Sequence, residues 1–439
     1  MTPPGDAVRS RRAGTRSVGR NSPLKTAARA LAVSLVMTAL MPFARAEDKF
    51  ISVPVLGAIM KIDGDTGVAT TFASGLGVPF YGFWTTDGKL YMPDREFGVI
   101  FEIDDQGTLG LLTAGGLLSS VVTVAPDPNG GLVASDLPLN HVVHVAFDGT
   151  QTLVHDAASS GGLISGPGGL AYAPNGDLYV ANNIGNSIVK IAPDGAISLF
   201  STDPLISQPG GIAIDNAGNM FVAQYSTNRI VRFRLDTGVA DVFAENAALM
   251  TRPNDVKLAR SGGLLTTSKA SNLLRVDSLG NITEEFKDLA YGEIVGVNTR
   301  EDATACSGSF VTYGGGTPGA GGHVPFLRGI FNPCPGHSIA LEFGDFLGGT
   351  PGALFIGFQP TSLAFVGGTL LVDPFGPFIQ VSFPFPGAGP GDGDFRLPFV
   401  LANEPALVNL KLYLQAAASD AAAPGGVSLS NGLEETIGS

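Results

Sequence analysis

The sequence contains little cysteine, no long apolar run and none of the common catalytic motifs. Its two cysteines, Cys306 and Cys334, have no histidine or acidic pattern beside them, which argues against a role as metal ligands or nucleophiles. No Gly-x-Ser-x-Gly turn, His-Glu-x-x-His motif or phosphate-binding loop occurs in the 439 residues. No stretch approaches the roughly 20 apolar residues of a membrane-spanning helix, so we expect no transmembrane anchor.

Positive charge is scarce as well, and much of it lies at the N-terminus. Residues 1–46 hold eight of the 26 Lys and Arg, an apolar run over 30–40 and the small-residue site Ala44-Arg45-Ala46, a pattern typical of a secretory signal peptide. This segment also holds one of the 39 acidic residues, so 18 basic and 38 acidic residues remain without it, a net charge of −20. Such a chain repels phosphate backbones and anionic lipid, so we do not expect nucleic acid as a partner.

The signal peptide predicts a secreted, periplasmic or extracellular location. In an oxidising compartment, Cys306 and Cys334 most simply form a disulfide. The bond would close a short loop near the start of the C-terminal part of the chain, a constraint worth about 2 to 4 kcal/mol.

What the sequence does contain is a repeat. The segments GLAYAPNGDLYVANNIGNSIVKIAPDG (169–195) and GIAIDNAGNMFVAQYSTNRIVRFRLDTG (211–238) have the same order of apolar strands and turns. Each has a second alternating strand and then a turn of the Asp-Gly type, which is a strong hairpin signal. The same template fits six register positions, spaced by 40, 42, 46, 42 and 44 residues: Phe50, Leu90, Leu132, Leu178, Met220 and Leu264.

A period of 40 to 46 residues with four short strands per unit predicts the blades of a β-propeller, because a lone four-stranded sheet has two apolar faces and needs a neighbour on each. A first strand precedes five of the register positions, but none precedes Phe50. Conversely, the strand Ile294–Val297 has no second strand after it. We therefore predict an all-β, six-bladed propeller over 47–303 whose last blade is closed by both ends of the segment.

Residues 48–298 resemble the six-bladed propellers of the NHL-repeat and gluconolactonase-like group, and also the repeats of streptogramin lyases. The segments that carry this resemblance are GPGGLAYAPNGDLYVANNIGNSIVKIAPDG (166–195) and QPGGIAIDNAGNMFVAQYSTNRIVRF (208–233). The resemblance implies a fold. It does not decide between chemistries, because propellers serve as binding scaffolds and as enzymes.

The gluconolactonase resemblance implies a divalent cation in the central channel, held by Glu, Asn and Asp. RPNDVKLARSGG (252–263) is similar to the Asn-Asp strand of that family, and Glu293 in YGEIVGV is similar to its Glu strand. Asn254, Asp255 and Glu293 are thus candidate ligands for one Ca²⁺ or Zn²⁺. Two further inner positions are glycine pairs, Gly168-Gly169 and Gly210-Gly211, where the family would offer oxygens. The alternative is that Asn254 and Asp255 cap a strand while Glu293 lines a solvated channel.

The streptogramin lyase resemblance would imply a histidine base in the channel. The predicted propeller has three histidines, His141, His144 and His155, all on one outer hairpin. His141 and His144 are three apart on a strand and point to opposite faces, so they form no simple ligand pair. We interpret them as surface residues.

After about residue 300 the charge thins out and Gly, Pro and Phe become frequent. Short apolar runs separated by Gly and Pro predict a small antiparallel β-sandwich over 304–439. The predicted strands are 339–341, 353–358, 369–372, 378–383, 407–414 and 427–429. This segment resembles a C-terminal module of secreted proteins of environmental bacteria, for which the resemblance implies no chemistry.

Three functions follow from these observations. The first is a secreted binding scaffold for a small molecule, a polysaccharide or a protein, with the sandwich as an accessory module. The second is a metal-dependent, gluconolactonase-like hydrolase built on Asn254, Asp255 and Glu293, which needs a further oxygen ligand and a base from another blade. The third is a streptogramin-type lyase, which needs a channel histidine that the sequence does not offer.

Overall fold

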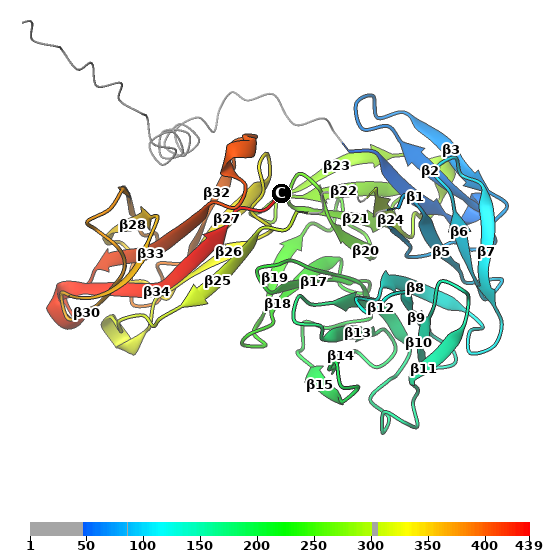
Figure 1. The fold of residues 1–439 in the computed structure, drawn as a ribbon, viewed down its shortest axis with the longest axis horizontal. Helices are drawn as coiled ribbons and strands as arrows, with labels where there is room; N and C mark the ends of the chain where they lie inside the picture. The colour runs from blue at the N-terminus through cyan, green and yellow to red at the C-terminus, as the bar shows by residue number, and fades with distance from the viewer. Residues whose placement is uncertain (1–46, 86, 301–305) are drawn as a thin grey trace, which may run out of the picture.

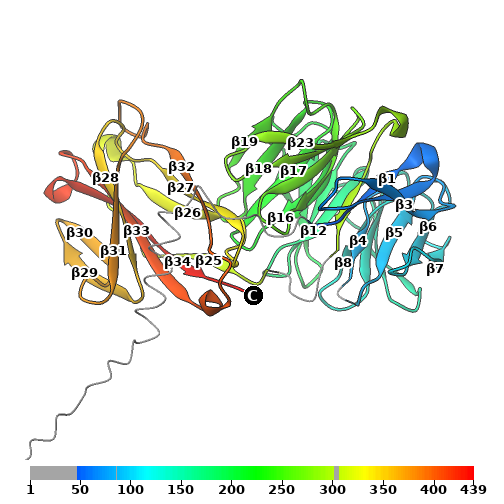
Figure 2. The ribbon, with the colours of Figure 1, turned by 90° about the horizontal axis from the view of Figure 1, so that it is seen from above.

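A computed structural model describes residues 47–85, 87–300 and 306–439. The predicted signal peptide and the predicted domain boundary at 303/304 lie outside the described residues. The fold is all-β, as predicted, with a β-propeller followed by a smaller sandwich module over 306–439 (Figures 1 and 2). No helix among the described residues is long and apolar enough to cross a membrane.

The propeller consists of six four-stranded antiparallel sheets that stand around a common axis (Figure 1). We name each sheet by its innermost strand. In order from the inside outward, the sheets are β24 (Val297–Thr299), β1 (Lys49–Val53), β2 (Ala58–Ile62) and β3 (Ala69–Ser74); β4 (Phe83–Trp84), β5 (Leu90–Asp94), β6 (Val99–Ile103) and β7 (Leu109–Ala114); β8 (Val121–Pro126), β9 (Leu132–Asp136), β10 (His141–Val145) and β11 (Gln151–His155); β12 (Pro167–Tyr172), β13 (Leu178–Asn182), β14 (Ser187–Ile191) and β15 (Ile197–Ser201); β16 (Pro209–Ile214), β17 (Asn219–Gln224), β18 (Arg229–Arg234) and β19 (Ala240–Glu245); β20 (Pro253–Leu258), β21 (Leu264–Ser268), β22 (Asn272–Val276) and β23 (Ile282–Lys287).

The β24 sheet is assembled from both ends of the propeller segment. β24 pairs antiparallel with β1, with Ile51 opposite Val297 and Phe50 opposite Asn298. Ile51 and Val297 are fully buried, and their apolar contacts continue into the β20 sheet through Leu265. This pairing gives the inner edge of β1 a partner and completes a sheet of four strands like the other five.

Neighbouring sheets are joined by a turn that recurs between the second and third strand of each sheet. The turn residue has a left-handed backbone in all six sheets, at Gly57, Gly98, Asn140, Asn186, Asn228 and Ser271. In three sheets its asparagine Oδ1 accepts a hydrogen bond from the backbone N–H of the next sheet's entry loop, at Gly166, Gln208 and Arg252, over 2.6 to 2.8 Å. Where glycine stands, a Cβ would collide with the next loop, 2.2 Å from the Leu76 carbonyl oxygen at Gly57. Glycine and asparagine tolerate this backbone conformation best, so the repeat selects them.

The module is a sandwich of a five-stranded and a three-stranded sheet with an added hairpin (Figure 2). The larger sheet has the order β25 (Ser309–Tyr313), β34 (Val427–Thr436), β33 (Lys411–Ser419), β28 (Pro351–Gly357) and β31 (Phe378–Pro384); the smaller has β26 (Phe326–Ile330), β27 (Ser338–Gly344) and β32 (Phe395–Val400); the hairpin has β29 (Pro360–Phe365) and β30 (Gly368–Val372). Single 3-10 turns connect strands at η1 (Pro54–Leu56), η2 (Leu289–Tyr291), η3 (Ala320–Gly322), η4 (Pro405–Leu407) and η5 (Pro424–Gly426). The disulfide between Cys306 and Cys334 joins the chain before β25 to the loop after β26.

One predicted strand of the module is displaced. The pattern over 407–414 predicts a strand that starts at residue 407, but β33 starts at Lys411 and runs to Ser419. Pro405 starts a 3-10 turn that ends at Leu407, and the alanines 416–418 continue the strand into the buried interior of the sandwich. Four strands, β25, β26, β29 and β32, were not predicted.

The module packs against the β16 and β20 sheets through an apolar contact. Phe331 is almost fully buried and stacks on Phe221 of β17, with ring centroids 5.4 Å apart, and meets Phe243 of β19 edge-on at 6.1 Å. The backbone N–H of Phe331 donates to Oδ2 of the buried Asp215, over 2.9 Å. The propeller and the module therefore share one continuous apolar core.

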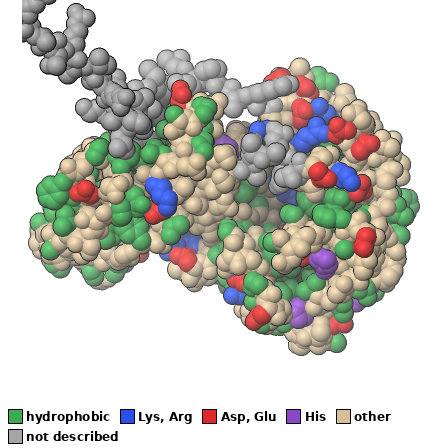
Figure 3. All heavy atoms as spheres, in the orientation of Figure 1, with side chains coloured by type: hydrophobic (Ala, Val, Ile, Leu, Met, Phe, Trp, Pro, Cys, Tyr) green, Lys and Arg blue, Asp and Glu red, His purple; other side chains and the backbone are tan. Residues whose placement is uncertain are grey.

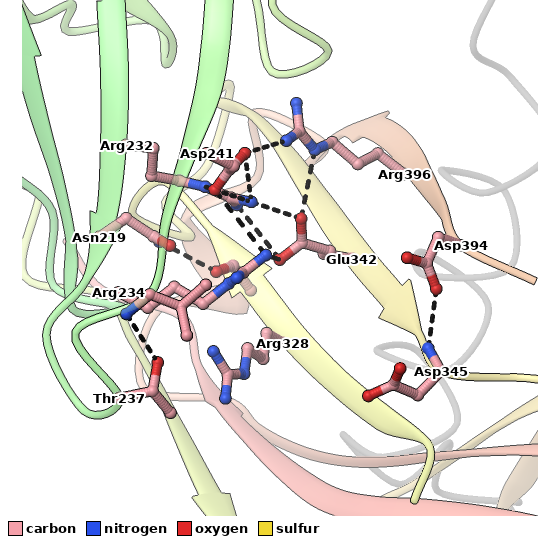
Figure 4. A network of polar contacts seen from close by, with 12 residues as sticks. Asn219, Arg232, Arg234, Thr237, Asp241, Arg328, Glu342, Asp345, Asp394 and Arg396 are labelled. Carbon is pink, nitrogen blue, oxygen red and sulfur yellow. Dashed lines mark hydrogen bonds and ion pairs between the residues drawn. The ribbon is translucent and has the colours of Figure 1, made fainter. Parts of the chain in front are cut away.

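A network of buried charges lies beside this apolar contact (Figure 4). Arg232 of β18 is fully buried and donates to Asp241 over 3.0 Å and to Glu342 of the module over 2.6 Å. Arg234 and Arg396 also reach Glu342, at 3.3 and 3.4 Å. Burial would raise the pKa of Glu342, but the positive charges of Arg232, Arg234 and Arg396 outweigh it and lower the pKa to about 2.

We predict that Glu342→Gln destabilises the protein by about 3 kcal/mol, because it leaves the charge of the fully buried Arg232 with only Asp241 as its partner. Asp236→Asn is the matched control: it breaks the partly exposed pair with Arg328 across the same interface and should cost less than about 1 kcal/mol. Denaturant unfolding measures both values. Equal, small losses in the two variants would contradict the role assigned to Glu342.

A second buried carboxyl group lies inside the module without an ionic partner. Glu435 of β34 is 1 % exposed and faces the sandwich core between Leu433 and Ile437. Its Oε1 has no hydrogen-bond partner among the described residues. Burial raises the pKa of Glu435 to about 8, so the side chain is protonated in the folded protein below that pH.

This carboxyl makes stability fall as the pH rises from about 4.5 to 8, because the unfolded chain releases the proton over that range while the folded protein keeps it. The slope is at most about 1.4 kcal/mol per pH unit. Glu435→Leu should flatten this dependence and stabilise the protein at pH 8. Glu434→Gln, at the next and more exposed position, is the control and should leave the slope unchanged. Thermal unfolding between pH 5 and 8 tests this, and an unaltered slope in Glu435→Leu would refute it.

Candidate functional site

A pocket of about 470 Å³ lies at one end of the central channel. The entry loops of the innermost strands and the turns after the second strands surround it. Its lining residues come from all six sheets: Pro54, Val55, Val78, Phe80, Tyr81, Arg95, Val122, Leu137, Gly168, Asn183, Gln208, Gly210, Tyr225, Asn254, Glu293 and Val295. A volume of this size is typical of small-molecule sites.

The pocket has an apolar wall and a polar wall. The β24, β4 and β8 sheets supply mainly apolar side chains, Pro54, Val55, Val295, Val78, Phe80, Val122 and Leu137. The β12, β16 and β20 sheets supply Asn183, Gln208, Tyr225 and Asn254, and Glu293 of the β24 sheet completes the polar wall. A ligand that fits this pocket therefore has one apolar side and one side that exchanges hydrogen bonds.

Tyr81 closes the base of the pocket. Its ring is 4 % exposed, and a Cβ built on Gly210 would lie 3.6 Å from its hydroxyl oxygen. The β4 and β16 sheets that carry these residues face each other across the ring of six sheets, so Tyr81 reaches across the channel. Burial, and then the negative charges of Asp255 and Glu293, raise the pKa of Tyr81 well above its usual value. The phenol is therefore a neutral hydrogen-bond donor at the base of the pocket.

Three of the four glycines in the pairs beside the pocket are required by close packing. A Cβ on Gly169 would lie 2.3 Å from the Gly210 carbonyl oxygen, and one on Gly210 would lie 2.3 Å from the Asn254 carbonyl oxygen. A Cβ on Gly211 would lie 2.4 Å from Oδ1 of Asp255. Neighbouring innermost strands approach so closely that a side chain has no room at Gly169, Gly210 and Gly211, whereas a Cβ on Gly168 would meet its nearest atom at an ordinary 3.5 Å.

Two of the three predicted cation ligands face the pocket. Asn254 Nδ2 donates to Glu293 Oε1 over 2.9 Å, and Lys269 Nζ lies 3.4 Å from the other carboxylate oxygen of Glu293. Lys269 also donates to the Tyr225 hydroxyl at 3.4 Å. Both oxygens of Glu293 thus have partners, and its charge is balanced by a lysine.

The third predicted ligand, Asp255, is turned into the wall. It is fully buried, and its carboxylate accepts the backbone N–H of Val256 over 2.9 Å and that of Val297 over 3.1 Å. Because Val297 begins β24, this contact links the β20 sheet to the sheet that closes the ring. Burial raises the pKa of Asp255 to about 6, although Lys257 and the two N–H groups act in the opposite direction. As arranged, the three residues do not fit a divalent cation: the charge of one is matched by lysine and another points away.

The three propeller histidines lie away from the pocket, on β10 and β11. Each ring forms a hydrogen bond with a backbone carbonyl: His141 with Leu117, His144 with Gly130 and His155 with Gly195. Within the described residues, the pocket lining includes no histidine. In the module, His337 lies near Cys306 and Cys334, but their sulfurs are bonded to each other and offer no thiolate.

The residues that the sequence analysis missed form a ring at one repeat position. Five residues after each register residue, the turn places a side chain at the channel mouth: Val55, Arg95, Leu137, Asn183, Tyr225 and Lys269. The first five line the pocket, and Lys269 is the partner of Glu293. The repeat spacing alone would have identified this ring.

Comparisons with known proteins support the fold. No family model and no curated protein sequence matches the chain. Among solved structures, the chain is similar to one from a nidogen/laminin complex, with 17 % identity over 58 % of this chain and 98 % of that chain and a TM-score of 0.51. It is also similar to virginiamycin B lyase from Staphylococcus aureus, with 14 % identity, 82 % and 94 % coverage and a TM-score of 0.42. A gluconolactonase from Xanthomonas campestris gives 15 % identity, 59 % and 91 % coverage and a TM-score of 0.45. At these identities, the first similarity shows a shared propeller fold and does not identify an activity.

The placement of Lys269 leads to a prediction about cations. We expect Ca²⁺ and Zn²⁺ to change the melting temperature of the wild type no more than that of Glu293→Gln, because Glu293 is already neutralised by Lys269. Thermal shift assays at fixed ionic strength measure this. A cation-dependent rise in the wild type that disappears in Glu293→Gln would instead establish a cation site in the channel.

Proposed function

We propose that this protein is a secreted binding protein that holds a small organic ligand at the channel mouth, with the C-terminal module as an accessory domain. The observation that carries the proposal is the pocket itself, which is closed at its base by Tyr81 and has an apolar wall opposite a polar one. Such a combination of apolar lining with a few convergent polar groups is typical of ligand sites. Secretion is inferred from the predicted signal peptide, and the disulfide is compatible with it.

Exposed apolar side chains extend the apolar wall outward. Five of them lie in the turns after the second strands of four consecutive sheets: Val55 (67 % exposed), Leu56 (49 %), Phe97 (54 %), Leu139 (41 %) and Ile184 (61 %). Isolated exposed apolar residues are ordinary, but their recurrence in one kind of turn on the pocket face is typical of an interaction surface. This face therefore suits a ligand that extends beyond the pocket.

The module leaves this face open. β16 starts at the pocket, with Gly210 lining it, and the turn after β16 carries Asp215 and Asn216, which contact the module. Pocket and module thus lie at opposite ends of the same strand, six residues apart. Figure 3 shows that charged side chains are sparse on the module surface seen in that view. We propose that the module is the part that associates with other surfaces while the propeller binds its ligand.

The competing proposal is the metal-dependent hydrolase. Its favouring observation is that Asn254 and Glu293 line the pocket and contact each other. It needs Asp255 to turn out of the wall, Lys269 to release Glu293, and a base from another sheet. Binding without turnover needs none of these rearrangements, so we place it first.

A pocket-filling variant tests the proposed function. A library of small organic fragments, screened by saturation-transfer NMR, should yield fragments that bind the wild type. Leu137→Trp should abolish this binding, because Leu137 lines the pocket and a larger ring would fill it. Leu153→Trp is the matched control: it changes an exposed leucine on β11, the outermost strand of the same sheet, and should leave binding intact.

Two results would contradict the proposal. One is a screen that finds no fragment for the folded wild type. The other is a set of fragments whose binding is the same in Leu137→Trp as in the wild type.

A further inference from the structure

Two arginines at the pocket have aromatic contacts but no anionic partner. The guanidinium of Arg95 lies 5.3 Å from the centre of the Phe80 ring, and that of Arg252 lies 5.5 Å from the centre of the Tyr225 ring. Across residues 47–85, 87–300 and 306–439, neither guanidinium forms a hydrogen bond or an ion pair, and both side chains are exposed. The acidic neighbour Glu96 is not paired with Arg95 either.

These arginines flank the pocket from opposite sides. Arg95, Phe80 and Tyr225 line it, and Arg252 stacks on Tyr225 at the rim. Phe80 and Arg95 belong to the β4 sheet and Tyr225 to the β16 sheet, which face each other across the channel. The remaining charges of the site, Glu293 and Lys269, offset each other. Asp255 adds a negative charge behind the wall, so what distinguishes Arg95 and Arg252 is that they have no ionic partner among the described residues, in a chain whose overall net charge is −13.

The backbone at Arg252 has a conformation that glycine would adopt more easily than arginine. Arg252 has a φ of 49°, and Gln208, at the same position of the preceding sheet, has a φ of 47°. Both precede a proline, and the sheet before them has Gly166, with a φ of 62°, at the same position. Glycine adopts this conformation without strain, whereas other residues pay a steric cost there, most of all before proline. Strained residues of this kind cluster at functional sites.

We propose that the pocket binds an amphipathic organic carboxylate, with its apolar body against the Phe80 wall and its carboxylate attracted to the unpaired guanidinium groups of Arg95 and Arg252 at the mouth. This inference rests on the proposed function and names the ligand class. A guanidinium presents paired N–H donors that match the two oxygens of a carboxylate, and stacking on an aromatic ring holds the group in place. The nearby carboxylate of Glu293 disfavours a doubly charged phosphate more than a singly charged carboxylate.

The probes are naphthoate and its uncharged amide, naphthamide, which share one apolar body and differ in the charged group. Titration calorimetry on the full mature chain should give an affinity for naphthoate at least about tenfold higher than for naphthamide. The difference should shrink with added salt, because the charged contacts lie at the exposed rim.

Arg252→Gly separates recognition from folding. It removes the guanidinium and places glycine where the backbone favours it, so the melting temperature should stay the same or rise while the preference for naphthoate falls to about threefold or less. Arg95→Gln should reduce the preference in the same way. Arg229→Gln is the control: Arg229 pairs with the exposed Glu245 on the outer strands of the β16 sheet, and the variant should keep the wild-type preference.

The outcomes are distinguishable. If both probes bind wild type equally, or if Arg252→Gly keeps the preference, the carboxylate assignment is wrong while the proposed pocket function stands. If neither probe binds and Leu137→Trp makes no difference to any fragment, the pocket function fails as well.

Discussion

The close approach of the six innermost strands is the constraint on which the channel depends. At Gly169, Gly210 and Gly211 a Cβ would lie within 2.4 Å of an atom of the next sheet, and at Gly296 it would lie 2.3 Å from the Phe80 carbonyl oxygen. The innermost strands pack against each other's backbone, which narrows the channel so that the Tyr81 ring, packed beside Val122 and Val295, reaches across it. The same packing leaves no room for an oxygen-bearing side chain at Gly169, Gly210 and Gly211. A narrow channel built on glycine therefore favours a closed pocket over a cation site.

The distribution of charge also follows from structural contacts inside the fold. Acidic side chains dominate the chain, but several of them lie inside the fold in structural roles. Asp94 and Asp136 end second strands and accept backbone N–H groups of their own sheet's entry loop, at Gly77 and Ser119. Glu342 neutralises arginines at the interface with the module. Positive charge without a partner is left at the channel mouth, where it is available to a ligand.

Much of the propeller could be predicted because its signal is repeated. One template, read at Leu178 and Met220, identifies the register residue of each sheet, and those residues lie in the second strands. The same template contained the pocket ring, since Arg95 and Tyr225 follow their register residues by five positions. The ring was not predicted because the residue type at this turn position differs from sheet to sheet, whereas the strand residues are similar in every sheet.

The remaining features could not be predicted because they depend on contacts that have no repeat. The orientation of Asp255 is decided by the backbone N–H of Val297, 42 residues later. Arg232 and Glu342 are 110 residues apart and lie in different parts of the fold. The module has no internal template either, so strands such as β25 and β32 become recognisable only through their partners.

The pairing of β1 with β24 has a consequence for synthesis. β1 leaves the ribosome first, and its inner edge has no partner until residues 297–299 follow, after five other sheets have formed. For that period an apolar strand with the sequence KFISV presents open backbone groups, which favour pairing with another chain. Lys49 lies in this strand and is paired with Glu285 once the ring has closed. Before closure, the unpaired ammonium group of Lys49 opposes edge-to-edge association with another chain. The same lysine therefore hinders aggregation of the nascent chain and forms an ion pair in the closed ring.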